Sequence, residues 1–467
     1  MAETSTSTNP HNMSISKTIS QSASPYLCGL LILFTLGIGN ISVQAQTAGS
    51  FTLEDCIERA KDYSIQARQG LIAVQIEEEN RKEAQQSILP NLNAGASWVN
   101  NWGLFIDPFT NVIQRQVRIQ NYSGNLSSSV PVFQGLANHN NIKRSQVNVR
   151  AAQKNYEAAI NDLQLMVSNA FVGVLFAEEL LRVAEQQVQI TAIQVNRVIN
   201  EVEAGTRPQG DLFDIQAQLA REEQNQITTE NNLRSAKLAL AQLMLWDDYE
   251  SLNLSYPDFE LESPGLLALS TQQIYEKALG NQPQIERDAL NLQSAQLGKN
   301  IATASYYPSI RLSGSMSTGA SDRISDDFGK QFDENLGENL VLSMNIPIYN
   351  RRQVTSSVNR AQLNVMNAEL QLKQSKNQLL QQIQSAYNDA KAAYNKYRAD
   401  EKTVNSLKTA FNYTEERYKV GLINAYEYNL SKNQLTAAES EMVRDKFDAL
   451  FKLMVLDFYY NQKIELQ

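Results

Sequence analysis

The stretch EAGTRPQGDLFD, residues 203–214, places two carboxylates just after a glycine that interrupts a helical pattern. Asp211 and Asp214 are three residues apart, so both lie on one face of the helix expected there. A second interruption, YKVGLINAYEY at residues 418–428, places Glu427 at the position that matches Asp211. These acids also have a structural explanation, because Asp211 can stabilise a helix N-terminus through the dipole and Glu427 can belong to a capping box.

Other side chains with catalytic or metal-binding chemistry are scarce. Of the two histidines only His139 lies beyond residue 45. A single histidine cannot form a histidine-rich metal site or supply most acid–base machinery. The chain contains no HExxH and no GxSxG, and LGKNIAT lacks the first glycine and the final hydroxyl residue of a phosphate-binding loop. The net charge of −9 argues against nucleic acid as a partner. We therefore expect no enzyme, no metal and no cofactor.

Residues 1–45 have the composition of a signal peptide with an N-terminal extension. Lys17 supplies the positive charge, YLCGLLILFTLGIG the apolar region, and VQA the cleavage site. The apolar run is too short to cross a membrane comfortably. Met13 is an alternative start to Met1, because MAETSTSTNPHN has no signal character. Export leaves Cys56 as the only cysteine, so no internal disulfide can form.

The rest of the chain contains an internal sequence duplication. ILPNLNAGASW matches YYPSIRLSGSMS, VPVFQG matches IPIYNR, and Gly205 and Gly421 are 216 residues apart (421 − 205). We expect a first repeat over residues 46–246, a linker over 247–270 and a second repeat over 271–467. Each repeat should read helix, helix, strand, strand, very long helix, glycine turn, helix, which makes the fold mainly α with a small β part.

The longest helix carries a seven-residue apolar repeat. No proline occurs between Pro131 and Pro208, and apolar residues recur every seven positions from Ile160 to Val202. A second row three positions later is largely small, as at Ala170. This spacing predicts a coiled-coil seam with close approach of the helices. At 1.5 Å per residue, roughly 65 to 70 residues would make a rod about 100 Å long.

Four segments alternate between apolar and small polar side chains, two at about 91–131 and two at about 309–347. The pattern suits transmembrane β-strands, and the ordinary alternative is a half-exposed sheet of a soluble protein. Trp98, Trp102 and Tyr122 lie where aromatic side chains would meet a membrane interface. Four strands cannot close a barrel and an open edge cannot sit in lipid, so several chains must share one barrel. Two chains or three would serve, and the sequence alone favours neither.

Together these features resemble the TolC-type outer-membrane efflux proteins, from about residue 51 to residue 462. The duplicated order of a strand with the LPNL motif, a strand with the VPVFQG motif, a long helix and an RYKVGL turn carries the resemblance. It implies a homotrimer in which a twelve-stranded β-barrel in outer-membrane lipid continues into a long α-helical periplasmic tunnel. Such a trimer is the passive duct of a tripartite efflux or type I secretion system, with a periplasmic adaptor protein and an inner-membrane transporter as partners. The alternative is a periplasmic coiled-coil adaptor or scaffold, which would lack the paired amphipathic strands.

The two glycine turns are expected to end helices in the left-handed conformation. The following helices should then begin with the capping pairs Thr206–Gln209 and Asn424–Glu427. By the resemblance, the turns are the tips of helical hairpins that dock on the adaptor. The docking residues are then Ala204, Gly205, Thr206, Val420, Gly421 and Leu422.

The resemblance also gives the acids a role, because residues six and nine positions after a tip glycine narrow the closed mouth of such tunnels. Asp211 and Asp214 take both places in the first repeat. In the second repeat Glu427 takes the first place and Leu430 the second. The acids would make a throat that attracts cations, and Arg207 would hold it shut by pairing with an acid of the neighbouring hairpin. The transported solute, the pump class and the ring that closes the tunnel stay open.

Overall fold

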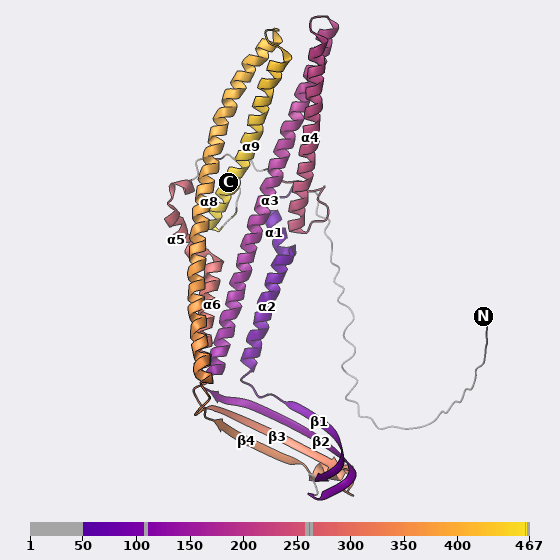
Figure 1. The fold of residues 1–467 in the computed structure, drawn as a ribbon, viewed down its shortest axis with the longest axis vertical. Helices are drawn as coiled ribbons and strands as arrows, with labels where there is room; N and C mark the ends of the chain where they lie inside the picture. The colour runs from indigo at the N-terminus through magenta and orange to yellow at the C-terminus, as the bar shows by residue number, and fades with distance from the viewer. Residues whose placement is uncertain (1–49, 107–110, 257–260, 262–264, 463, 465–467) are drawn as a thin grey trace, which may run out of the picture. The chain divides into compact units, whose positions relative to one another are not determined.

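The computed structural model describes residues 50–106, 111–256, 261, 265–462 and 464. The predicted signal peptide and both candidate start residues lie outside this part of the chain, as do some positions of the predicted linker. Within the described part, helices and strands follow the duplicated order that the sequence predicted (Figure 1).

The elements of the first half are α1 (Leu53–Tyr63), α2 (Ile65–Gln86), β1 (Asn93–Ile106), β2 (Ile113–Gln134), α3 (Ala137–Glu203) and α4 (Gln209–Met244). Those of the second half are α5 (Thr271–Asn281), α6 (Pro283–Ala304), β3 (Ser309–Ser321), β4 (Gly337–Asn345), α8 (Gln353–Lys419) and α9 (Ala425–Asn461). Two short elements were not expected: the 3-10 helix η1 (Gly265–Ala268), and α7 (Phe328–Glu334) in the polar connection between β3 and β4. Asp327 explains the start of α7, because its carboxylate accepts the N–H of Gly329 at 3.0 Å.

The four strands form one antiparallel sheet in the order β1-β2-β3-β4 (Figure 1). The register places Trp98 opposite Tyr122 and Leu312 opposite Leu342. Residues directly opposite one another point to the same face of a sheet, so the apolar rows of neighbouring strands coincide, as the alternation predicted. β1 and β4 are the edge strands, and the sheet of one chain is therefore open.

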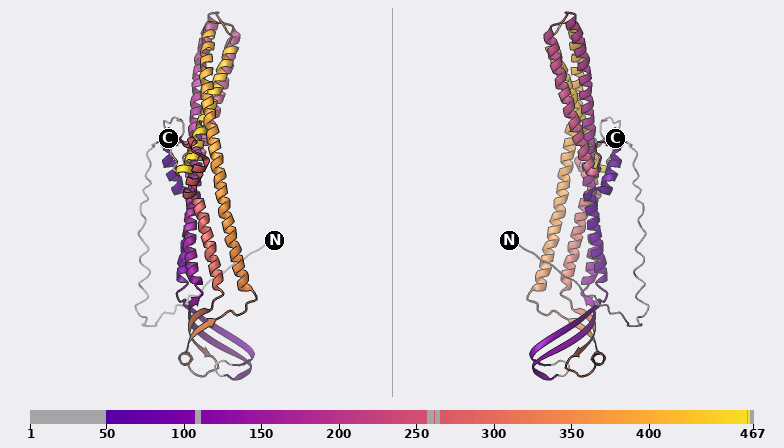
Figure 2. Two further views of the ribbon diagram at one scale, coloured as in Figure 1. Left: turned by 90° about the vertical axis from the view of Figure 1, so that its left-hand side faces the viewer. Right: turned by 90° about the vertical axis from the view of Figure 1, so that its right-hand side faces the viewer.

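The helices beyond the sheet pack side by side in the order α2, α3, α6, α8 (Figures 1 and 2). α3 turns back into α4 and α8 into α9, so two helical hairpins extend away from the sheet. α9 packs on α3 and also touches α4, which joins the hairpins. The main core, around the fully buried Phe171 and Leu175, lies where α1, α3, α4 and α9 meet. A second core, around Ile383, lies between α5, α8 and α9.

The predicted coiled-coil seam of α3 is buried or half-buried along its length. α3 and α8 each have 67 residues. The buried seam residues of α3 are Leu163, Val167, Val174, Ala177, Ala184, Thr191, Val195 and Val198. α3 also contains an 18-residue stretch that is apolar enough to cross a membrane by composition. Its packing against α1, α4 and α9 accounts for that apolar character, since buried helix faces are apolar too.

Both hairpin turns end their first helix in the same way. Gly205 and Gly421 have φ values of 72° and 74°, the left-handed conformation that was predicted. At the first turn the N–H of Gly205 donates to the carbonyl of Val202 and the N–H of Thr206 to that of Glu201, each at 2.9 Å. Equivalent bonds close the second turn. This double pattern is the Schellman motif, which satisfies carbonyls that the helix end leaves unpaired.

The helix starts after the turns differ from one another. Asn424 caps α9 as predicted, because its side chain accepts the N–H of Glu427 at 2.9 Å. The prediction that Thr206 caps α4 is wrong. Pro208 occupies the N-cap position of α4 without a side-chain cap, and the Thr206 hydroxyl instead donates to the carbonyl of Glu201 at 2.8 Å. Thr206 therefore stabilises the end of α3 rather than the start of α4.

Candidate functional site at the helical hairpins

Arg207 is the centre of the first hairpin tip. Its Nε lies 2.7 Å from the Glu201 carboxylate and its Nη1 3.6 Å from that of Asp211. The guanidinium also lies 4.5 Å from the ring centre of Tyr418, which belongs to the second hairpin. Both acids belong to its own hairpin, and the predicted pairing with an acid of a neighbouring hairpin stays a prediction. Because the turn is short, the acids at the end of α3 and the start of α4 reach the guanidinium first.

The second tip is aromatic where the first is charged. The rings of Tyr418 and Tyr428 stack with their centres 4.5 Å apart and an interplanar angle of 21°. Ile423 and Ala425 are buried against them. Burial raises the pKa of both tyrosine hydroxyls, so they stay neutral. The hydroxyl oxygen of Tyr418 is buried without a hydrogen-bond partner in the described part of the chain.

The three predicted gate acids have different surroundings. Asp211 is held by Arg207, with a side chain that is 25% exposed. Asp214 and Glu427 are exposed. Among the described residues, no group of three or more histidine, cysteine or acidic side chains is placed to hold a metal ion. One chain therefore does not bring these acids together, and any ring that they form must be built from several chains.

The predicted docking residues all lie at the surface. Ala204, Gly205 and Thr206 are exposed at the first tip, and Gly421 at the second. Val420 and Leu422 are 69% and 71% exposed. Two large apolar side chains open to solvent at one tip are typical of a surface that another protein covers.

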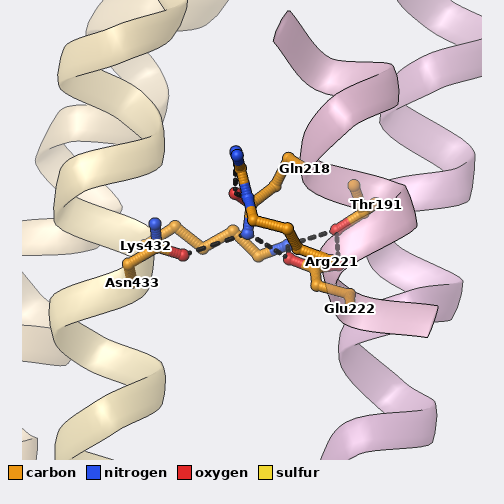
Figure 3. Close-up of polar contacts among 6 residues, drawn as sticks. All are labelled: Thr191, Gln218, Arg221, Glu222, Lys432 and Asn433. Carbon is orange, nitrogen blue, oxygen red and sulfur yellow. Dashed lines mark hydrogen bonds and ion pairs between the residues drawn. The ribbon is translucent and has the colours of Figure 1, made fainter. Parts of the chain in front are cut away.

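A buried ion pair between the hairpins was not predicted. Lys432 reaches from α9 to the first hairpin, where its Nζ lies 2.9 Å from the Glu222 carboxylate on α4 and donates to the Thr191 hydroxyl on α3 (Figure 3). Thr191 in turn donates to Glu222. The side chains of Lys432 and Glu222 are 5% and 12% exposed. One cation thus connects three helices.

Amide groups extend this cluster. Gln218 on α4 donates to Glu222 at 3.0 Å and to Asn433 on α9 at 3.1 Å, and Arg221 donates to the Gln218 carbonyl oxygen at 2.9 Å (Figure 3). The sequence did hold a signal for it. Lys432 stands in the buried row Ala425, Tyr428, Lys432, Leu435 of α9, and a lysine in such a row needs a buried acceptor.

Two exposed apolar stripes mark the outer helices of the row α2, α3, α6, α8. The α2 stripe consists of Ile65, Ile72 and Ile76, and the α8 stripe of Leu363, Met366 and Leu370. Ile72 is two residues from the buried Val74, and Leu363 two residues from the buried Val365. Two residues along a helix turn the direction by about 200°, so each stripe points away from the helix row.

The stripes lie at the same level along the helices. A Cβ at Gly70 of α2 would meet the Tyr156 ring of α3. Next to it on α3, Asn155 accepts from Arg287 of α6 at 3.1 Å, and the neighbouring Asp288 accepts from Ser375 of α8 at 2.6 Å. Position 70 of α2 is therefore level with position 375 of α8. Since α2 runs toward the sheet and α8 away from it, Ile76 is level with about position 369, beside Leu370.

The predicted membrane-interface aromatics lie on the sheet. Trp98 and Trp102 are 60% and 73% exposed. Tyr122 is half-buried, since its ring meets that of Phe328 on α7 edge-on, with centres 4.8 Å apart. The structure therefore leaves the two tryptophans open and covers the tyrosine.

Thiol chemistry has no support at Cys56. The side chain is fully buried in the main core. Burial, together with Asp55 and Glu54, raises the pKa of the thiol to about 12. Because the thiolate is the reactive form, this cysteine is inert at neutral pH.

Comparisons with known proteins point in one direction. A family model described as "Outer membrane efflux protein" matches residues 57–244 and 274–453. Outer membrane protein TolC of Escherichia coli (strain K12) is 24% identical over 386 residues, which cover 80% of this chain and 74% of that protein. A second relative, outer membrane protein TolC of Salmonella enteritidis, is 25% identical over 301 residues, 62% of this chain and 57% of that protein.

Two solved structures of similar fold come from the outer membranes of other bacteria. The Campylobacter jejuni CmeC outer membrane channel has a TM-score of 0.74 and 16% identity, over 89% of this chain and 86% of that one. The outer membrane protein VceC of Vibrio cholerae has a TM-score of 0.72 and 16% identity, over 88% and 97%. At such identities the likeness is one of fold.

Proposed function

Because the chain belongs to the outer membrane efflux protein family and is therefore an outer-membrane efflux channel, we propose that three copies join into one duct, which receives solutes from a periplasmic adaptor and an inner-membrane transporter. The matches to channels do not favour the alternative of a periplasmic adaptor or scaffold. Since the family transports rather than catalyses, we also infer that the chain is not an enzyme.

The open sheet carries this proposal. β1 and β4 have no second strand partner in the described part of the chain. In lipid each unpaired backbone group costs several kcal/mol, so a spanning sheet must close on itself. Three sheets of four strands, joined β4 to β1, give a closed barrel of twelve strands.

The apolar stripes support the same assembly in the helical part. When β4 of one copy joins β1 of the next, α8 of the first copy comes beside α2 of the second. The α8 stripe and the α2 stripe then face each other at the same level, because Leu370 is level with Ile76. Burial of such side chains contributes about 1.5–3 kcal/mol each. Closure of the ring would therefore bury the apolar stripes that are exposed in one chain.

The hairpin tips supply the proposed partner surface and gate. In the trimer, six tips surround the periplasmic mouth. The exposed Val420 and Leu422 would contact the tip of the adaptor. Asp211 and Asp214, repeated three times around the axis, would form the acidic constriction. Arg207 supports a closed state through its contact with Tyr418 of the second hairpin.

Native mass measurement of the detergent-purified protein tests the assembly. We expect a trimer, and Leu370→Glu should shift it to monomer because the change places a charge inside the proposed contact. Gln371→Glu is the matched control: it adds the same charge one position along α8, on an exposed side chain that is not part of the stripe. A folded parent monomer would overturn the proposed duct.

A further inference from the structure

A cleft of about 720 Å³ lies over α6, between α3 and α8, at the ends of these helices that adjoin the sheet. Polar side chains from all three helices line it: Arg144, Asn148, Asn291, Ser294, Arg360 and Asn364. The lining contains two arginines and no carboxylate. The cleft is thus a basic hollow rich in amide and hydroxyl groups, which is the chemistry that binds anions.

Gly298 leaves room in the cleft for the side chain of Arg144. Gly298 of α6 has no side chain, and a Cβ built there would lie 3.8 Å from Nη1 of Arg144. The guanidinium therefore extends from α3 across α6 into the cleft. Its Nη2 donates to Asn141 Oδ1 at 3.2 Å, an uncharged acceptor one turn away. Most N–H donors of the guanidinium group therefore stay available for a ligand.

The second arginine faces the same hollow from α8. Arg360 is exposed and forms no ion pair within the described part of the chain. Two cations that line one hollow make its electrostatic potential positive, which favours a carboxylate or phosphate group there.

A second cleft, between α2 and α3, shares Arg144 and Asn148 with the first and is also lined by Glu77 and Glu83. Both hollows thus lie on one side of the helix row. On α3, Arg144 and Asn148 are half-buried, whereas Lys143 and Arg150, which point elsewhere, are exposed. In the proposed ring this side of the helix row would face the axis.

We propose that this cleft is an anion-binding subsite on the tunnel wall, in which Arg144 and Arg360 hold the carboxylate or phosphate group of a passing solute. The inference rests on the proposed trimeric duct, which would carry three such subsites near the barrel. It predicts that anionic solutes pause there during transport. The acidic mouth at the hairpin tips has the opposite preference, so the two ends of the tunnel select different charges.

Block of single channels by tripolyphosphate tests the proposal. The trimer is reconstituted in a bilayer of zwitterionic phosphatidylcholine, which excludes anionic lipid as the ligand, and tripolyphosphate is added on the barrel side. We expect block of the parent. Arg144→Gln together with Arg360→Gln should raise the half-blocking concentration by up to about 25-fold, since each of the two exposed ion pairs contributes up to about fivefold in affinity. An unblocked parent, or equal block in both channels, would overturn the subsite.

Two further variants separate this subsite from general charge. Lys143→Gln removes the same charge from α3 at a position that lines neither cleft, and should leave the block unchanged. Gly298→Leu keeps both arginines but fills the space that the guanidinium of Arg144 occupies, so it should weaken the block as well. Normal block in Gly298→Leu would count against the cleft.

A rival explanation for Arg360 is a contact between copies. Glu83 of α2 is about level with Arg360, and α2 of the next copy would lie beside α8. If Arg360→Gln weakens the trimer in native mass measurement and leaves the block unchanged, Arg360 belongs to the interface and the subsite is wrong. A conducting trimer without block refutes the subsite alone, whereas a chain that forms no conducting trimer refutes the duct.

Discussion

Lys432 of α9 lies 2.9 Å from Glu222 of α4, with both side chains at least 88% shielded from solvent. The pair is the charged contact that holds the second hairpin against the first in the interior of the described chain, and Thr191 of α3 completes it. Buried charges of opposite sign stabilise a structure only while both are present. The cluster therefore makes separation of the two hairpins costly.

Removal of one partner should destabilise the protein more than removal of both. Lys432→Met leaves the Glu222 carboxylate buried without its cation, which is expected to cost about 3–5 kcal/mol. The double variant, with Glu222→Met as well, should recover most of that loss. The measurement is the unfolding midpoint of each variant in detergent.

An exposed ion pair provides the control for the Lys432 and Glu222 variants. Arg398 and Glu401 of α8 lie 2.9 Å apart with side chains 52% and 39% exposed. Its removal should cost about 1 kcal/mol or less. If the Lys432 variant loses no more than this control, the cluster does not hold the hairpins together.

The acidic mouth should bind multivalent cations from the periplasmic side. In single-channel recording we expect strong block of the parent, and much weaker block when Asp211 and Asp214 are both changed to alanine, because three copies of each acid would converge on the axis. Asp211 is already engaged by Arg207, so Asp214→Ala alone should account for most of the effect. Equal block in parent and double variant would move the constriction to Glu427.

The second hairpin tip should be the adaptor contact. Leu422→Glu places a charge on a side chain that is 71% exposed, so neither the fold nor the trimer should change. Cross-linking to the adaptor in cells, and export, should both fall. Leu430→Glu, eight residues further from the tip glycine and 47% exposed, is the control, and should leave cross-linking intact. Unchanged export by Leu422→Glu would mean that docking uses another surface.

The stability of the second hairpin should depend on pH through Asp400. A hydrogen bond to the carboxyl of Asp445, with burial, raises the pKa of Asp400 from 3.8 to about 6. Lys396, Glu441 and Arg444 are the other charged groups of this contact between α8 and α9. Because the folded chain holds this proton more tightly than the unfolded chain, the stabilisation is full below about pH 4 and is lost as the pH rises through about 6.

Asp400→Asn tests this pH dependence, since the amide keeps a donor for Asp445 but cannot ionise. The melting temperature of the variant should exceed that of the parent at pH 7, and the difference should shrink as the pH falls to 4. Asp389→Asn, on an exposed position of the same helix, should follow the parent. A constant difference between parent and Asp400→Asn across this range would contradict the assignment.

Features that depend on nearby residues were predictable from the sequence. Gly205 and Gly421 could be placed in left-handed turns because a helix C-terminus favours glycine there. The sheet faces followed from alternation alone, since opposite residues share a face. Local chemistry also misled in one place. Thr206 has the sequence of a capping residue, but Pro208 fixes the backbone two residues later and takes the N-cap position.

The sequence did not reveal which residues from distant parts of the chain contact one another. Lys432 and Glu222 are 210 residues apart, and only the packing of α9 on the first hairpin brings them together. Arg207 meets Tyr418 for the same reason. Neither pair has a spacing that a pattern could reveal. The role of Gly298 was equally hidden, because it depends on the direction that the Arg144 side chain takes.

The duplication of the chain lowers the symmetry of any ring that three copies build. Six identical short chains would present one tip surface six times, and every substitution would alter all six. A doubled chain keeps only threefold equivalence, and its halves have diverged: Arg207 makes one tip charged, while Tyr418 and Tyr428 make the other aromatic. A partner ring of six like members would therefore meet two alternating surfaces. Substitutions can therefore change one kind of tip while the other keeps its contact with the partner. A ring of six identical chains without the duplication would not permit such independent change.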